Sequence, residues 1–245
     1  MTEPLVIRRD DGGITTLTLN RPDKLNALTP ALFVELRGHL DALRDRDDIS
    51  CVILRGAGRS FCAGHDLPAI ASGERAPSRH FEPETIDALE ALPMPTIAQV
   101  HGHCFTGGLE LALACDLIVA AESTRLGDTH GQWGLVPIWG MSVRLPERVG
   151  RSTAKELMFT SRRISGREGL EIGLVDRCTP DDSLEATVAA LSAEIAANSP
   201  GTNRIVKRLV DGHPVLDRTQ RLLNERTLPH GLPADMAERM GGSTR

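Results

Sequence analysis

The residues best suited to chemistry lie between positions 95 and 116, where two glycines and one carboxylate meet at the start of an apolar helix. Gly107 and Gly108 stand at the expected amino end of that helix. Backbone N–H groups have no helical partner there, and the helix dipole is positive. Because glycine has no side chain, a ligand oxygen can approach these N–H groups closely. The pattern is therefore suited to holding a developing oxyanion.

Glu110 follows within one turn and is the single charge among Leu109, Leu111 and Ala112. Burial raises the pKa of a carboxyl group, which is what a general acid or base requires. An acid in a first helical turn can also serve only to complement the helix dipole, and glycine pairs are common before helices. Taken alone, these residues favour the structural interpretation over the catalytic one.

The elements that must position this segment follow from the periodicity of apolar residues. Thr106 is the expected N-cap of a helix over 109–115, and Thr29 and Pro30 are expected to begin a helix that runs to residue 43. Further helices are predicted over 84–92, 142–149, 152–159 and 165–172. Strands are predicted over 5–9, 14–20, 51–54, 61–66, 96–100, 117–120 and 174–176. Loops are expected over 72–80 and over the glycine-rich stretch 125–139.

The order of these elements predicts an α/β chain with two parts. The first 120 residues repeat a rough strand–strand–helix unit, which indicates the stacked turns of one spiral core. After Pro180 only helices are expected, over 182–197, 201–210 and 216–224. We therefore predict a spiral core over 1–180 and a helical appendage over 181–245. Its apolar residues are suited to packing on a neighbouring subunit: Leu222, Leu223, Leu228 and Met236.

Composition restricts the partners of the chain. It has 245 residues, a net charge of −5, 3% aromatic residues and no tyrosine. A mildly acidic chain with so few aromatic side chains gives no support for nucleic-acid binding. The longest apolar stretch, 109–121, is interrupted by Glu110 and Asp116 and is too short to span a bilayer. No nucleic acid and no membrane are expected as partners.

The five cysteines are odd in number, contain no C-x-x-C pair and fall mostly in apolar runs, as expected in a reducing compartment. Since no signal peptide is evident, we predict a cytoplasmic protein. His101 and His103 alternate beside cysteines, but no spacing suggests the tetrahedral set of a zinc site. No metal is expected.

Several short motifs follow one another in a specific order and spacing over nearly the whole chain. They are Asn26-Ala27-Leu28, residues 60–67, Gly102, residues 107–116, Leu126-Gly127, residues 134–137, Arg144-Leu145-Pro146, Val149-Gly150, Ala154 and residues 173–176. In this order and spacing the chain resembles the enoyl-CoA hydratase/isomerase family, also called the crotonase family. The resemblance implies a spiral of strand–strand–helix turns, a helical trimerisation region and an acyl-CoA thioester as substrate.

The resemblance also implies roles for individual residues. The backbone N–H groups of Ala63 and Gly107 would hold the thioester oxygen as an enolate forms, which fits the use of preorganised donors for developing charge. The turn over 63–67 would line the path of coenzyme A. No further cofactor is expected, because coenzyme A is part of the substrate. A homotrimer or a dimer of trimers is expected. The implied coenzyme contacts are Ala63, Gly64, His65, Asp66 and Leu67.

The chain departs from the hydratase pattern at one position. Hydratases of the family use two glutamates, and Glu110 matches the first. Counting from Gly127 or back from Pro137 places His130 at the second. His130 can replace the carboxylate as a water-holding or proton-carrying group, since imidazole titrates near neutrality. Alternatively Glu110 acts alone, or His130 is only a hydrogen-bonded loop residue. Asp128 is near, but its position does not match the motif.

Three functions follow from these alternatives. The main prediction is an enoyl-CoA hydratase of the lyase class, which adds water to a 2-enoyl-CoA through an enolate. The first alternative is an isomerase or another enolate-forming enzyme that uses Glu110 alone. The second is a scaffold that binds coenzyme A without catalysis, although a lone buried carboxylate is costly without a use.

Overall fold

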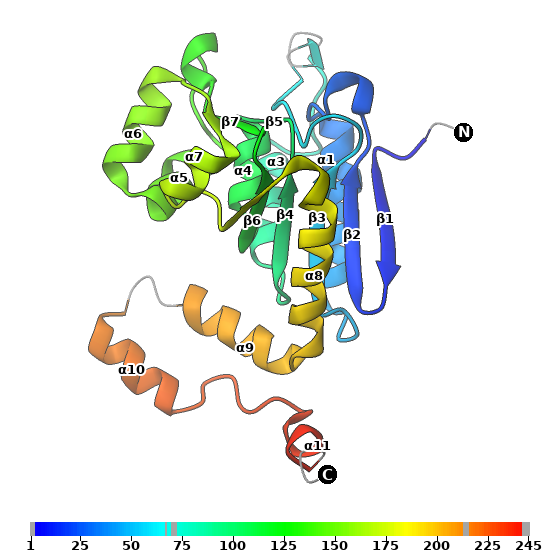
Figure 1. The fold of residues 1–245 in the computed structure, drawn as a ribbon, viewed down its shortest axis with the longest axis vertical. Coiled ribbons are helices and arrows are strands. Elements are labelled where there is room, and N and C mark those ends of the chain that lie inside the picture. Colours follow the sequence, from blue (N-terminus) through cyan, green and yellow to red (C-terminus); the bar gives the residue numbers. More distant parts are fainter. Residues whose placement is uncertain (1–2, 67, 70–72, 213–215, 242–245) are drawn as a thin grey trace.

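Six strands form the main sheet of the computed structural model, which describes residues 3–66, 68–69, 73–212 and 216–241 (Figure 1). Their order is β1-β2-β3-β4-β6-β9. Only β1 and β2 are antiparallel. The parallel strands read as continuous apolar runs because both faces of the sheet are covered. The strands are β1 (Val6–Asp11), β2 (Ile14–Leu19), β3 (Cys51–Gly56), β4 (Thr96–Val100), β6 (Leu117–Ala121) and β9 (Arg177–Thr179).

A second, smaller sheet contains β5 (His103–Phe105), β7 (Arg125–Gly127) and β8 (Ile164–Ser165). After β4 the chain passes into β5, and after β6 it passes into β7, so successive turns of the chain add to both sheets. The predicted spiral arrangement is confirmed. The sequence predicts none of these short strands. β7 lies in a predicted loop, and β8 ends at the first residue of a predicted helix. They escape prediction because pairing with distant segments defines them: Cys104 pairs with Leu126.

The buried apolar residues form two cores, a larger and a smaller one. Most of the helices contribute to the larger core. The Thr29 side chain caps α1 (Pro30–Arg44) by accepting from the Leu32 N–H at 3.3 Å, as predicted. α1, α3 (Phe81–Glu90) and α4 (Gly107–Leu113) contribute buried residues to this core. α5 (Met141–Val149) and α6 (Arg151–Thr160) complete it, and α7 (Gly166–Glu171) precedes β9. The described residues also contain the short 3₁₀ helices η1 (Pro22–Lys24), η2 (His130–Trp133) and η3 (Asp181–Ser183).

Some predicted elements are wrong. Residues 174–176 form no strand, and β9 begins at Arg177, because the N–H groups of Leu174 and Val175 both donate to the carbonyl oxygen of Gly169 in α7. Residues 61–66 contribute isolated bridges instead of a strand, Cys62 with Cys104 and Leu28 with His65. The stretch 125–139 contains β7 and η2 and is not only a loop. Of the loop expected over 72–80, residue 72 lies outside the described residues, and 73–80 form turns and irregular backbone.

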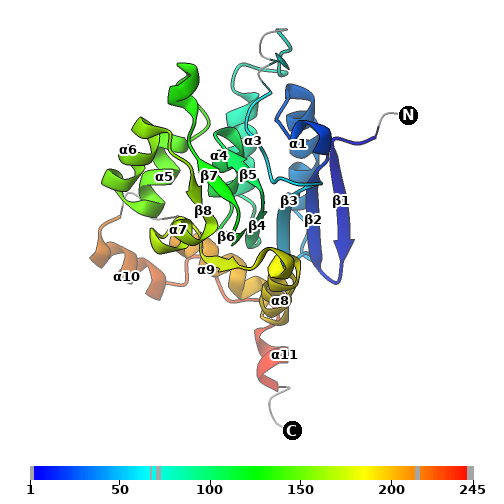
Figure 2. The ribbon, with the colours of Figure 1, turned by 45° about the horizontal axis from the view of Figure 1, so that its top comes forward.

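The last part of the chain is helical, as predicted. α8 (Leu184–Ala197) packs on the main sheet through Leu184, Val188 and Leu191, opposite the larger core. α9 (Pro200–Asp211), α10 (Arg218–Arg226) and α11 (Met236–Gly241) extend away from the sheets (Figures 1 and 2). α9 and α10 bury no residue. The boundary between two domains at residue 180 stays a prediction, since α8 shares a core with the sheet.

None of the helices in the described ranges has the length and apolar character that crossing a bilayer requires.

Candidate active site

A cavity of about 330 Å³ lies at the amino end of α4. Four segments form its wall: residues 63–65, the start of α4, the chain from η2 to Trp139, and the first turn of α3. Both catalytic residues predicted from the sequence, Glu110 and His130, line it. Its apolar lining comes mainly from the chain after η2. The site therefore combines residues from distant parts of the sequence.

Close packing requires glycine at the start of α4. A Cβ atom on Gly107 would lie 2.4 Å from Cζ3 of Trp139, and one on Gly108 would lie 2.4 Å from the carbonyl oxygen of Cys62. Thr106 stands before the helix, but its φ of 44° and ψ of −114° prevent side-chain capping, so the predicted N-cap hydrogen bond is absent. Within the described residues, the N–H of Gly107 has no hydrogen-bond acceptor.

The second predicted oxyanion donor is wrong. The N–H of Ala63 donates to the carbonyl oxygen of Leu25 at 3.0 Å and is therefore occupied. Leu28 pairs with the carbonyl of Gly64 and the N–H of Asp66, both at 2.8 Å. This pairing leaves the N–H of His65 without an acceptor among the described residues, on a residue that lines the cavity. No sequence pattern shows which N–H of this turn is free, because the pairing with Leu28 decides it.

Glu110 is 1% exposed. Its Oε1 accepts hydrogen bonds from the backbone N–H groups of Trp139 at 3.2 Å and Met141 at 3.1 Å. Burial raises the pKa of the carboxyl group, although these N–H donors and the charge of His130 oppose the effect. The carboxyl group is thus fixed in orientation through one oxygen and is suited to carrying a proton.

His130 is held by Asp128, which is 2% exposed. Oδ1 of Asp128 lies 2.5 Å from Nδ1 of His130 and accepts from the His130 backbone N–H at 3.1 Å. Burial acts to lower the pKa of His130, but the hydrogen bond and charge of Asp128, together with the charge of Glu110, outweigh it and raise that pKa. Because Nδ1 carries the proton donated to Asp128, Nε2 of the neutral ring is a hydrogen-bond acceptor.

The turn predicted to contact coenzyme A divides into two kinds of residue. Ala63 and His65 line the cavity, and the His65 ring packs on Trp139 with 4.9 Å between ring centroids. Gly64 and Asp66 hold the turn. The Gly64 φ of +103° suits glycine, and Asp66 pairs with Arg21 at 2.9 Å. Leu67 lies outside the described residues. The contacts with coenzyme A stay a prediction.

Trp139 and Glu82 line the same cavity, and no sequence pattern selects either residue. Trp139 fits against Gly107 and packs edge-on to Phe33 at 5.0 Å between centroids. Glu82 lies in the first turn of α3. Because this stretch is polar and contains other carboxylates, its sequence does not mark Glu82 as a site residue. Across the described ranges, no group of three or more His, Cys, Asp or Glu side chains is placed to hold a metal ion.

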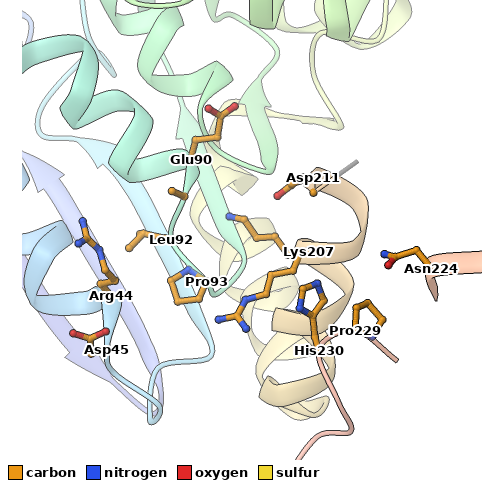
Figure 3. A pocket seen from close by; sticks show the side chains of 13 residues that line it. Arg44, Asp45, Glu90, Leu92, Pro93, Lys207, Asp211, Asn224, Pro229 and His230 are labelled. Carbon is orange, nitrogen blue, oxygen red and sulfur yellow. The ribbon is translucent and has the colours of Figure 1, made fainter. Parts of the chain in front are cut away.

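A second hollow, of about 540 Å³, lies between the core and the C-terminal helices (Figure 3). The ends of α1 and α3 form one wall, and α9 with the chain after α10 forms the other. Lys207 of α9 donates to Oδ2 of Asp116 at 2.8 Å. Burial, with the charge of Asp116, raises the pKa of Asp211. This hollow contains none of the predicted site residues.

The fold agrees with the comparisons with known proteins. The model of the enoyl-CoA hydratase/isomerase family matches residues 9–241, and the chain belongs to this family. The motif resemblance is thereby confirmed. The chain is 30% identical over 232 residues to the probable enoyl-CoA hydratase 1, peroxisomal, of Arabidopsis thaliana, covering 95% of this chain and 88% of that protein.

Two further relatives agree with this assignment. The short-chain-enoyl-CoA hydratase of Clostridium acetobutylicum is 32% identical over 210 residues, covering 84% of this chain and 80% of that protein. The crystal structure of enoyl-CoA hydratase from Bacillus anthracis superposes with a TM-score of 0.91 at 34% identity, covering 97% of this chain and 95% of that chain.

Proposed function

We propose that the protein is an enoyl-CoA hydratase that adds water to a 2-enoyl-CoA thioester. The observation that carries this proposal is the presence, in one cavity, of the buried carboxyl group of Glu110 and the Asp128-held imidazole of His130. Family membership supports an acyl-CoA substrate, with coenzyme A supplied by the substrate. His130 then performs the task of the second hydratase glutamate.

The N–H groups of His65 and Gly107, which have no acceptor among the described residues, are the proposed oxyanion donors. When a nucleophile adds to C3 of a 2-enoyl thioester, negative charge develops on the thioester oxygen. Two fixed donors stabilise that charge without reorganising, and removing one such donor typically costs about 10²–10³ in rate. The occupied N–H of Ala63 cannot contribute.

In the proposed reaction, Nε2 of neutral His130 accepts a proton from water as the water oxygen bonds to C3. The electrons of the C2–C3 double bond move toward the thioester and give the enolate. The protonated carboxyl group of Glu110 then donates its proton to C2, and the enolate oxygen returns to a carbonyl. The hydroxyl group of the product comes from the water, and the second hydrogen of the water stays on His130. Transfer of that proton from His130 to Glu110 restores the starting state.

The test incubates the protein separately with saturated, 2-enoyl and 3-enoyl thioesters of coenzyme A and follows product mass. We expect the 2-enoyl substrates to gain the mass of one water. Conversion of a 3-enoyl to a 2-enoyl thioester without any hydration contradicts the proposal and assigns an isomerase that uses Glu110 alone. Binding without any conversion contradicts it and leaves a scaffold.

A further inference from the structure

Glu82 places a third carboxylate on the wall of the cavity. It belongs to the first turn of α3 and is half-buried. Among the described residues, no side chain or backbone group donates a hydrogen bond to its carboxylate, and no cation pairs with it. The other two acids at the site both have partners: Asp128 holds His130, and Glu110 holds two backbone N–H groups.

A half-buried carboxylate that has no partner among the described residues is unfavourable, because burial removes it from water without a compensating hydrogen bond. Burial is the sole cause that shifts the pKa of Glu82, and it raises that pKa. A carboxylate in a first helical turn is ordinarily stabilised by the helix dipole, and the exposed Glu84 of the same turn is available for that purpose. Helix stability therefore does not account for a carboxylate that faces the cavity.

Glu82 also comes from a different element than the reacting groups: it belongs to α3, whereas Glu110 belongs to α4 and His130 to η2. The charges that act on Glu110 are those of His130 and Asp128, and the charges that act on His130 are those of Asp128 and Glu110. Glu82 contributes to neither. The cavity is otherwise lined largely by apolar side chains, among them Leu135, Val136 and Ile138. Glu82 adds a further polar group to this lining, beside Glu110 and His130.

We propose that Glu82 recognises a hydrogen-bond donor, such as a hydroxyl group, on the acyl chain at a distance from the thioester. This rests on the proposed function only in taking the acyl group of a thioester to occupy the cavity. A site whose polar group is left unpaired by the wrong substrate discriminates strongly against an analogue that lacks the donor. A hydrogen bond to a charged group corresponds to about tenfold to hundredfold in affinity.

The test measures binding by calorimetry with two saturated acyl-CoA thioesters of equal length, one ending in a hydroxyl group and one in a methyl group. Saturated thioesters have no double bond to hydrate, so the measurement is independent of turnover. We expect the wild-type protein to bind the hydroxyl form at least about tenfold more tightly. An amine-ended thioester shows whether a cationic donor is preferred over a neutral one, and either preference supports the proposal.

Two variants and one matched control complete the test. Glu82→Leu should abolish the preference or reverse it, and Glu82→Gln, which keeps the shape, should weaken it. Glu84→Gln, on the exposed side of the same turn, should leave it unchanged. Equal affinity of the wild-type protein for both thioesters, or a preference that persists in a folded Glu82→Leu variant, overturns the proposal.

The outcome is distinguishable from failure of the proposed hydratase function. A preference for the hydroxyl form without hydration of any 2-enoyl thioester removes the hydratase assignment and keeps the role of Glu82. Hydration of 2-enoyl thioesters without a preference for the hydroxyl form keeps the hydratase assignment and removes the role of Glu82.

Discussion

Asp128 holds His130 at two points, because the same carboxylate oxygen accepts from the backbone N–H and from Nδ1 of that residue. The contact determines which ring nitrogen is protonated in the neutral state and fixes the ring against rotation. A carboxylate two residues before the histidine thus acts through the histidine and not on the substrate. Since Glu110 and His130 interact, they are expected to titrate as a coupled pair.

Asp128→Asn should change the pH dependence of hydration. The reactive pair carries one proton in total, so the rate should fall at low pH, where both groups are protonated, and at high pH, where neither is. Removing the Asp128 carboxylate lowers the pKa of His130, which its charge and hydrogen bond raise in the wild-type protein. The alkaline limb of the kcat profile should therefore move to lower pH, and misorientation of the ring should cost about 10²-fold in kcat. A variant that loses rate with an unshifted profile would show that Asp128 has only a structural role.

His130→Ala should remove most of the hydration rate and spare any proton shift that Glu110 performs alone. His130→Glu restores two carboxyl groups and should retain more hydration than His130→Ala. The measurement is the rate with one 2-enoyl-CoA substrate between about pH 5 and 9, which spans the ordinary histidine pKa near 6.5. If His130→Ala hydrates as fast as the wild-type protein throughout this range, His130 does not take part.

Glu110→Gln keeps the size of the side chain and can still accept from the Trp139 and Met141 N–H groups. It removes the exchangeable proton, so kcat should fall by about 10²–10⁴ with little change in the affinity for a saturated acyl-CoA. Single-turnover rates and calorimetry separate the two effects. Turnover at the wild-type rate would refute the assignment.

Gly107→Ala should destabilise the fold, because the added Cβ would lie 2.4 Å from Cζ3 of Trp139. Overpacking of this kind costs about 1–3 kcal/mol in the free energy of unfolding. The matched control is Gly38→Ala within α1, where nothing lies within 4 Å of the new Cβ. That substitution should be neutral or stabilising by about 0.5–1 kcal/mol. Urea unfolding of both variants provides the comparison, and equal behaviour would contradict the close approach of Trp139.

We propose that the protein assembles as a homotrimer or a dimer of trimers. The C-terminal helices and the chain between them leave Leu222, Leu223, Leu228 and Met236 exposed, and α10 buries no residue. Sedimentation equilibrium at micromolar concentration should give three or six times the mass of the 26.5 kDa chain. Leu222→Glu with Leu223→Glu should weaken the assembly, and a stable wild-type monomer would contradict the proposal.

Elements with a strong local sequence signal, such as an apolar run or a helix cap, are predicted correctly. The predicted strand over 96–100 and β4 (Thr96–Val100) coincide, and Thr29 with Pro30 correctly begins α1. β5, β7 and β8 are two or three residues long and depend on pairing across the chain, so periodicity cannot reveal them. Leu174 and Val175 show that an apolar run can fill a core without forming a strand.

The candidate site also contains residues that the sequence reveals and features that depend on tertiary structure. Glu110 is conspicuous as a charge in an apolar helix, and motif spacing selects His130. Three features depend on tertiary structure alone: the N–H of His65, and not that of Ala63, having no acceptor among the described residues, the hydrogen bond of Asp128 to His130, and the position of Glu82 on the cavity wall. Hydrogen-bond pairing and the direction of a side chain on a polar helix leave no mark in composition or spacing.

The ion pair between Lys207 and Asp116 bears on the order in which the protein is completed during its synthesis. Asp116 follows the helix that carries Glu110, and its Oδ2 also accepts from the N–H of Thr96 at 2.7 Å. Lys207 lies 91 positions later in the chain. A chain that folds as it leaves the ribosome, amino end first, therefore forms α4 before Lys207, which pairs with Asp116 just after that helix, has been made. α9 thus supplies its contact to the segment after α4 only when synthesis is nearly complete.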